Sequence, residues 1–158
     1  MVRSSVRRAG PRDAAALLPL VRGFYRAEGI PFRKAKLAHG LRRLLREGRL
    51  GVVVVAEDSR SKALLGYAIG TFGFDLEFAG PDSFLTDLFV DPRHRRGGVG
   101  RRLLQAALRE LAGRGARAVT LLVWPRNRAA RLLYAGVGFR VVERVAMVRV
   151  LRAVRRAA

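Results

Sequence analysis

Residues 84–104 read Phe-Leu-Thr-Asp-Leu-Phe-Val-Asp-Pro-Arg-His-Arg-Arg-Gly-Gly-Val-Gly-Arg-Arg-Leu-Leu. The apolar first third of this stretch predicts a strand over 84–90, which Asp91-Pro92 ends. A glycine-rich turn follows, and a helix begins directly after it. Because Gly97, Gly98 and Gly100 lack a β-carbon, a ligand can approach their backbone closely. Unpaired amides and the dipole at the start of a helix attract anions, so the stretch predicts a site suited to a pyrophosphate.

The same turn does not fit two well-known phosphate-binding loops. A P-loop needs Gly-x-x-x-x-Gly-Lys-Ser/Thr, and this stretch contains no lysine. A dinucleotide-binding fingerprint needs Gly-x-Gly-x-x-Gly, and Leu103 stands where its third glycine would be. Arginines at 93, 95, 96, 101 and 102 surround the turn, although an ordinary tight turn in an arginine-rich chain would have the same residues. Nucleotide triphosphatase and dehydrogenase functions are therefore disfavoured.

Hydrophobic spacing predicts the other elements of the chain. Helical spacing is found over 13–27, 37–45, 103–112 and 127–135, and strand-like runs cover 2–8, 50–57, 63–75, 118–123 and 139–151. Pro19 lies inside the first predicted helix and indicates a kink or a late start. The order β-α-α-β-β-β-α-β-α-β predicts one domain over 1–151, with a mixed sheet and helices on both faces. The basic tail 152–158 is expected to fray.

Composition narrows the range of partners. The 158 residues carry a formal net charge of +20, with 32 lysines and arginines and no cysteine. Such charge either attracts a polyanion such as RNA, DNA or a phosphorylated cofactor, or reflects the codon bias of a GC-rich genome. Without cysteine there is no disulfide or thiolate metal site, and two isolated histidines do not suggest a metal. Because no membrane-length apolar run or secretion signal is found, we expect a soluble, cytoplasmic protein without a membrane partner.

Two motifs lie on the predicted strand–turn–helix and on the last predicted helix. Arg95-Arg96-Gly97-Gly98-Val99-Gly100 has the pattern Gln/Arg-x-x-Gly-x-Gly/Ala, and Val90-Asp91-Pro92 precedes it. Residues 127–134 have the pattern Asn-x-x-Ala-x-x-x-Tyr, and Gly138-Phe139 follows. In both motifs and in the order of elements, nearly the whole chain resembles the GNAT superfamily of N-acetyltransferases. The resemblance implies an α/β (α+β) fold with a mixed, mostly antiparallel sheet of six to seven strands and about four helices.

The resemblance also implies a cofactor, acetyl-CoA, and positions that bind it. The backbone of Leu88, Phe89 and Val90 would pair with the pantetheine arm. The pyrophosphate would be held by amides of Arg95, Arg96, Gly97, Gly98, Val99, Gly100 and Arg101. Asn127 and Ala130 would lie beside the pantetheine or the acyl end. Tyr134 would be the general acid that protonates the departing thiolate, although an aromatic core residue on an amphipathic helix would fit the same pattern.

The base that deprotonates the amine is less clearly indicated. Leu85-Thr86-Asp87-Leu88-Phe89-Val90 is similar to the Leu-Glu-Asp-Leu-Phe-Val strand of the diamine and polyamine acetyltransferase branch, with Thr86 where that branch has glutamate. Asp87 is then the best remaining carboxylate for the catalytic base. The alternatives are that Asp87 is only a strand acid paired with an arginine, or that a chain of water molecules acts as the base. Acids in loops near the acceptor cleft are candidates for substrate binding, or are simply solvated: Glu28, Asp75, Glu77 and Asp82, together with the neighbouring Thr86.

The resulting interpretation is an amine N-acetyltransferase that works by direct attack in a ternary complex. No cysteine nucleophile is needed for such a reaction. A small-molecule amine is the favoured acceptor, with no metal, and a homodimer is possible because members of the family are commonly dimers. The alternatives are acetylation of a protein N-terminus or lysine, for example at a ribosome where nucleic acid would hold a basic enzyme, and a non-catalytic acyl-CoA- or RNA-binding module.

Overall fold

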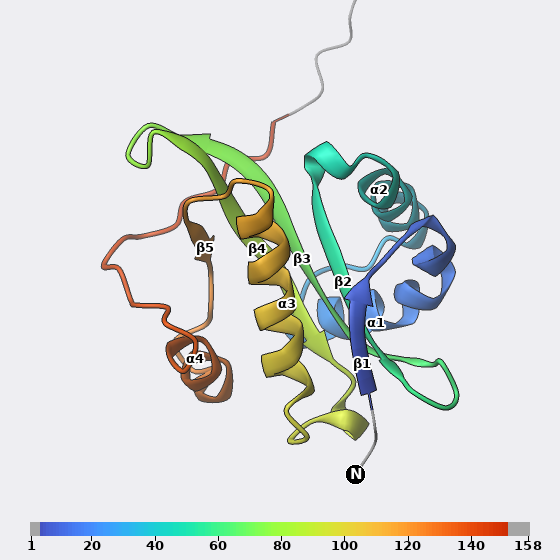
Figure 1. Cartoon of the computed structure of the whole chain (residues 1–158). Coiled ribbons are helices and arrows are strands. Elements are labelled where there is room, and N and C mark those ends of the chain that lie inside the picture. The colour runs from blue at the N-terminus through green and yellow to red at the C-terminus, as the bar shows by residue number, and fades with distance from the viewer. Residues whose placement is uncertain (1–3, 152–158) are drawn as a thin grey trace, which may run out of the picture.

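The computed structural model describes residues 4–151 and contains one five-stranded sheet in the order β1-β2-β3-β4-β5 (Figure 1). The strands are β1 (Ser4–Arg8), β2 (Gly51–Asp58), β3 (Leu64–Asp75), β4 (Gly80–Val90) and β5 (Val119–Leu121). The helices are α1 (Ala14–Glu28), α2 (Lys34–Arg46), α3 (Val99–Gly113) and α4 (Arg128–Ala135), with 3-10 turns at Pro11–Asp13, Gly48–Leu50 and Pro92–His94. Neighbouring strands from β1 to β4 are antiparallel, and β5 is parallel to β4. The predicted mixed, mostly antiparallel sheet with about four helices is confirmed.

The predicted count of six to seven strands is wrong, since residues 4–151 form five. The difference lies in 139–151, where a last strand was predicted and none is present. Alternating valines give this segment β propensity, but a strand also needs a neighbouring backbone to bond. Here the apolar side chains stay exposed, as Val145 (89%) and Met147 (91%) illustrate. The predicted basic tail, 152–158, lies outside the described residues.

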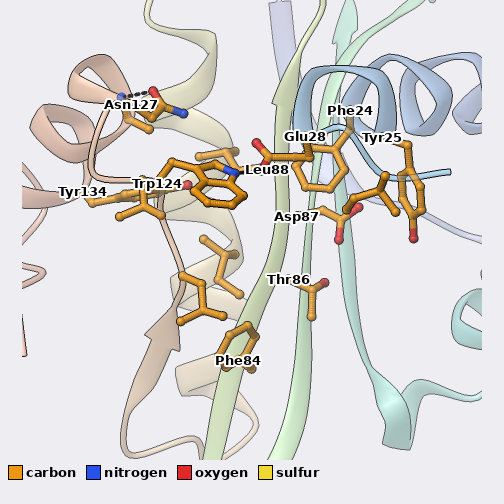
Figure 2. Close-up of a pocket in the computed structure, with 15 residues that line it drawn as sticks. Phe24, Tyr25, Glu28, Phe84, Thr86, Asp87, Leu88, Trp124, Asn127 and Tyr134 are labelled. Carbon is orange, nitrogen blue, oxygen red and sulfur yellow. Dashed lines mark hydrogen bonds between the residues drawn. The ribbon is translucent and has the colours of Figure 1, made fainter. Parts of the chain in front are cut away.

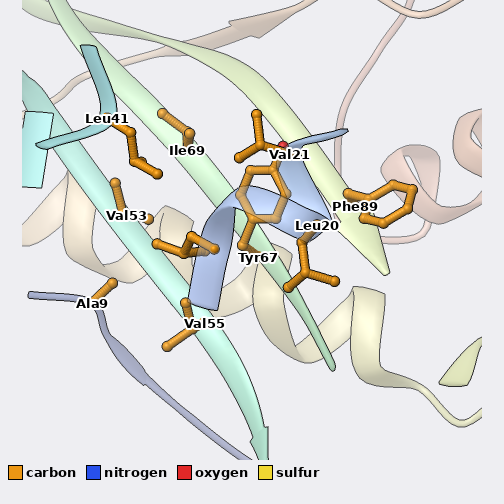
Figure 3. Packing of buried hydrophobic residues seen from close by; sticks show 10 residues of the cluster. Ala9, Leu20, Val21, Leu41, Val53, Val55, Tyr67, Ile69 and Phe89 are labelled. Carbon is orange, nitrogen blue, oxygen red and sulfur yellow. The ribbon is translucent and has the colours of Figure 1, made fainter. Parts of the chain in front are cut away.

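The sheet is buried on both faces, and its valine run shows why. Val53 and Val55 of β2 point into a cluster with α1 and α2 (Figure 3), whereas Val54 points into a second cluster with α3. The alternation of strand side chains therefore turns one continuous apolar run into two separate cores. The helix α1 begins at Ala14 and continues through Pro19, so a late start is excluded.

A β-bulge interrupts the pairing of β3 with β4. Gly70 pairs with Leu85 and Ile69 with Asp87, which leaves Thr86 as the extra residue of β4. An extra residue reverses the in–out alternation beyond it. Leu85 accordingly belongs to the α3-side core, while Phe89, four residues later, belongs to the α1-side core. The bulge thereby turns Asp87 toward the α1 side of the sheet.

The strands β4 and β5 separate after a short contact. Their parallel pairing covers Ser83–Leu85 and Val119–Leu121, while β4 stays paired with β3 as far as Val90. Beyond Leu85, β4 therefore has one edge that no described strand covers. Figure 1 shows β5 leading away from β4 toward α4. None of the helices formed by residues 4–151 is long and apolar enough to cross a membrane.

Candidate functional site

A cavity of about 270 Å³ lies where β4 and β5 separate. The end of α1, the strand β4, the segment after β5 and the helix α4 form its walls (Figure 2). It is lined by Phe24, Tyr25, Glu28, Ile30, Phe84, Leu85, Thr86, Asp87, Leu88, Leu122, Val123, Trp124, Asn127, Ala130 and Tyr134. The structure thus brings together seven residues that the sequence singled out at distant positions: Glu28, Thr86, Asp87, Leu88, Asn127, Ala130 and Tyr134.

Asp87 is held in this cavity by a buried tyrosine. The hydroxyl of Tyr67, on β3, donates a hydrogen bond to Asp87 Oδ2 at 2.8 Å. Burial raises the pKa of Asp87 above its ordinary value, although the bond from Tyr67 acts in the opposite direction. A carboxylate with a raised pKa is a stronger base. No local pattern marked Tyr67 as part of the site, because it looks like any aromatic residue of a buried strand.

Tyr134 projects from α4 into the cavity beside Asn127. Burial, followed by the negative charge of Glu28, raises the pKa of Tyr134 to about 12, so its phenol keeps its proton at neutral pH. Its ring packs edge-on against Phe139, with ring centres 5.7 Å apart. Asn127 caps the helix, since its Oδ1 accepts the backbone N–H of Ala130 at 3.1 Å. The Asn-x-x-Ala part of the motif therefore also has a structural role.

A long-range hydrogen bond connects two walls of the cavity. Trp124 Nε1 donates to Glu28 Oε2 at 2.8 Å and so joins the segment after β5 to the end of α1. The guanidinium of Arg126 stacks over the indole, 4.7 Å from its centre. Trp124 is 49% exposed and lines the cavity. A contact between residues this far apart leaves no local sequence signal.

The open edge of β4 presents backbone groups toward the cavity. Asp91 N–H donates to Leu65 O at 2.9 Å, and in an antiparallel ladder such bonded positions alternate with positions that face outward. By this alternation, the amides of Leu88 and Val90 point away from β3. The side chain of Arg95 agrees with this, because its Nε donates to the outward carbonyl of Val90 at 2.9 Å. Phe89, by contrast, has its side chain in the α1-side core.

The glycine turn forms a second, smaller hollow of about 240 Å³ beside this edge. It is lined by Leu65, Arg93, His94, Arg95, Arg96, Gly97 and Val99. Gly98 has a left-handed φ of 74° and caps α3, and Arg96 has a φ of 64°, which is uncommon for a residue other than glycine. A β-carbon added at Gly97 would meet no atom within 4 Å, so its backbone borders open space. The first amides of α3 have no helical carbonyl to bond, and they suit the oxygens of a phosphate.

Several arginines near the turn are engaged by the protein itself. Arg93 is paired with Asp91 at 2.8 Å, and Arg102 Nη2 donates to the hydroxyl of Ser4 at 2.6 Å. Arg101 Nη2 donates to the carbonyl of Gly136 at 3.1 Å, which joins α3 to the end of α4. The side chains of these three arginines are therefore held by groups of the protein itself.

Other predicted residues lie elsewhere. Asp75 ends β3 and Glu77 is in the turn to β4, and neither lines the cavity. Asp82 follows on β4, with its carboxylate next to Gly73. Within residues 4–151 no group of three or more His, Asp or Glu side chains is arranged to hold a metal ion.

Comparison with known proteins agrees with this geometry. Residues 19–139 match the acetyltransferase (GNAT) family. An uncharacterized N-acetyltransferase, YhfO, of Bacillus subtilis (strain 168) is 34% identical over 143 residues, covering 85% of this chain and 89% of that protein.

Solved structures show the same fold. An integron cassette protein, HFX_CASS3, from the mobile metagenome of Cole Harbour Salt Marsh superimposes with a TM-score of 0.81 at 26% identity, covering 94% of this chain and 91% of its own. The aminoglycoside N-acetyltransferase AAC(6')-Iy, solved in complex with CoA, has a TM-score of 0.79 at 19% identity, with coverage of 94% and 95%. The chain is therefore an acetyltransferase that belongs to the GNAT family.

Proposed function

We propose that the protein transfers an acetyl group from acetyl-CoA to a small primary amine, by direct attack within a ternary complex. The observation that carries this proposal is the separation of β4 from β5 after Leu85. It leaves the outward amides of β4 between an anion-binding turn on one side and a cavity with a buried carboxylate on the other.

The residues present fit acetyl-CoA. Backbone amides from Arg95 to Arg101 would bind the pyrophosphate, since the space above Gly97 is open. The outward groups of Leu88 and Val90 would pair with the amides of the pantetheine arm. The acyl end would then lie near Ala130 and Tyr134, which line the cavity.

The side chains of the cavity suit the proton transfers of the reaction. Acetyl-CoA supplies the acetyl group as a reactive thioester. Asp87 would take a proton from the substrate ammonium, which frees the lone pair of the nitrogen for attack on the carbonyl carbon. The N–H of Leu88 would donate to the carbonyl oxygen as negative charge develops there. Tyr134 would donate its O–H to the leaving sulfur, and the proton that the nitrogen loses on forming the amide balances the proton gained by the thiol.

A transfer assay tests the proposal. Purified protein, acetyl-CoA and a panel of amines are incubated, and thiol release is measured against a reaction without acceptor. The panel includes monoamines, polyamines, aminoglycosides and peptides with free N-termini. We expect release with small amines. Release with peptides alone would replace a small-molecule acceptor by a protein one, and release with polyamines alone would place the chain with the diamine and polyamine branch.

Acetyl-CoA is expected to stabilise the protein through the glycine turn. At a hundred times Kd, a ligand specific for the native state adds about 2.7 kcal/mol, which raises the Tm of a domain of this size by roughly 5–10 °C. Gly97→Ala should weaken binding about tenfold, or about 1.4 kcal/mol, because its methyl group occupies the space in front of the amides.

Gly113→Ala is the matched control for this experiment. Gly113 also has open space around its position and an ordinary φ, but it lies at the far end of α3. Thermal shift with and without acetyl-CoA separates fold stability from binding. Equal ligand-induced shifts in both variants would contradict the assignment of the pyrophosphate to the turn.

Asp87→Asn is expected to change the pH profile of the reaction. A base with a raised pKa that accepts a proton from the ammonium gives a plateau of kcat/KM between its own pKa and that of the amine. Below its pKa the carboxyl is protonated, and activity falls. In Asp87→Asn the rate should instead rise tenfold per pH unit up to the pKa of the amine, because free amine becomes limiting. The amide oxygen can still accept the bond from Tyr67, so the fold is retained. An unchanged profile would exclude Asp87 as the base.

A further inference from the structure

The charged side chains that line the cavity are of the opposite sign to the net charge of the chain. The protein has 32 basic residues among 158 and a net charge of +20. Yet none of the fifteen residues that line the cavity is lysine or arginine, and two of them, Glu28 and Asp87, are acids. Composition alone would place basic side chains here, so this lining favours a cationic ligand and disfavours an anionic one.

Backbone electrostatics add to the same preference. Glu28 is the last residue of α1, and Gly29 ends the helix with a left-handed φ of 69°. The negative end of the helix dipole therefore lies at the cavity wall, where it stabilises a positive charge. Figure 2 shows Glu28 close to Asp87, and its negative charge helps to raise the pKa of both Asp87 and Tyr134, so the carboxylate lies at the proposed reacting end of the cavity.

The other end of the cavity is apolar. In Figure 2, Glu28, Asp87 and Leu88 lie close together, while Phe84 lies apart from them along β4. Phe84 supplies an apolar ring at that far end, and neither acid lies there. A second ammonium group would lose its hydration there without gaining a partner. A hydrocarbon or aromatic ring would instead be favoured by burial.

The hydrogen bond between Trp124 and Glu28 fixes the orientation of the Glu28 carboxylate. Trp124 occupies Oε2 of the carboxylate at 2.8 Å and limits its rotation. The second oxygen, Oε1, can then accept an ammonium hydrogen. Because the bond also connects two walls of a cavity of about 270 Å³, it restricts the acceptor to a compact molecule.

We propose that the acceptor is a compact monoamine, with one ammonium group bound by Glu28 and an aromatic or branched aliphatic body that lies along β4 toward Phe84. This inference rests on the proposed function, since it names the substrate class of the same cavity. It predicts that polyamines and aminoglycosides bind poorly, because their further ammonium groups would meet the apolar end.

The single tryptophan of the chain allows a test that needs no turnover. Trp124 fluorescence is titrated with 2-phenylethylamine, with its neutral analogue 2-phenylethanol, and with spermidine, each with and without coenzyme A. We expect the monoamine to bind at least tenfold more tightly than the alcohol and than spermidine. Equal affinity for amine and alcohol, or tighter binding of spermidine, would overturn the proposal.

Two variants identify the carboxylate responsible. Glu28→Gln keeps an oxygen that can accept the bond from Trp124 but removes the charge, so the preference for amine over alcohol should fall to within about twofold. Glu77→Gln removes an exposed acid outside the cavity and should leave the preference intact. Unchanged preference in Glu28→Gln would refute the role of this residue.

The result of this binding test can be distinguished from the result of the transfer assay that tests the proposed function. Charge-selective binding without thiol release from acetyl-CoA would support the inference about recognition and refute the proposed reaction. Thiol release with other amines, in the absence of binding by 2-phenylethylamine, would support the reaction and refute the monoamine assignment.

Discussion

We expect Tyr134→Phe to lower kcat by about 10²–10⁴-fold, because Tyr134 is the proposed general acid and a positioned general acid accelerates a reaction by this range. The variant loses one hydroxyl, while the ring that packs against Phe139 remains. The thiolate would then leave without a hydrogen-bond donor, and the effect should appear in turnover. Since the phenol lines the cavity and not the hollow at the glycine turn, the Kd for acetyl-CoA should stay within about twofold. Initial rates of thiol release and the acetyl-CoA thermal shift measure the two quantities.

Tyr25→Phe provides the control for this result. Tyr25 lines the same cavity from α1, and its substitution removes the same atom from a different wall. We expect a much smaller change of kcat. Equal losses in the two variants would show that Tyr134 acts by shaping the cavity, and an unchanged kcat in Tyr134→Phe would remove it from the chemistry.

Leu103→Ala lowers the free energy of unfolding by about 2–5 kcal/mol, the cost of deleting a fully buried leucine. The side chain is 0% exposed and belongs to the core between α3 and the sheet. A β-carbon built on Gly66 would lie 3.1 Å from Leu103 Cδ1, so the leucine packs closely on the backbone of β3. The space that alanine leaves there cannot be filled without moving the helix. Urea denaturation followed by circular dichroism measures the loss.

Leu132→Ala is the matched control for stability. Leu132 also lies on a helix, but its side chain is 66% exposed. Its removal should change the free energy of unfolding by no more than about 0.5 kcal/mol. A loss as large as that of Leu103→Ala would mean that Leu132 is covered in solution.

Much of the fold could be predicted because its elements are encoded locally. The valine run of β2, the helical spacing of α1 and the glycine turn before α3 all lie within a few residues of their predicted positions. The strand β4 begins at Gly80, earlier than the predicted 84, because it pairs with β3 along the whole hairpin. The segment 139–151 has the same β propensity as the other strands but no paired neighbour, and propensity alone could not distinguish these cases.

Some residues of the candidate site could likewise be predicted from the sequence, and others could not. Motifs identified Tyr134, Asn127 and the glycine turn, because Asn127 and Tyr134 are about two turns of one helix apart and the glycines form one tight loop. Tyr67 was missed, since its contact with Asp87 depends on a bulge at Thr86 that exists only in the paired sheet.

The sequence by itself determined the glycine turn before α3, the helix α4 that follows Asn127 and the strand β2, because each depends on neighbours along the chain. Only the tertiary structure decided which acids line the cavity and which elements form its walls. The bond from Trp124 to Glu28 joins residues 96 positions apart, and the pairing of β4 with β5 ends at Leu85 although β4 continues to Val90. Such contacts depend on how whole helices and strands pack together. Residues that are far apart in the chain have no fixed spacing from which the sequence could predict the contact.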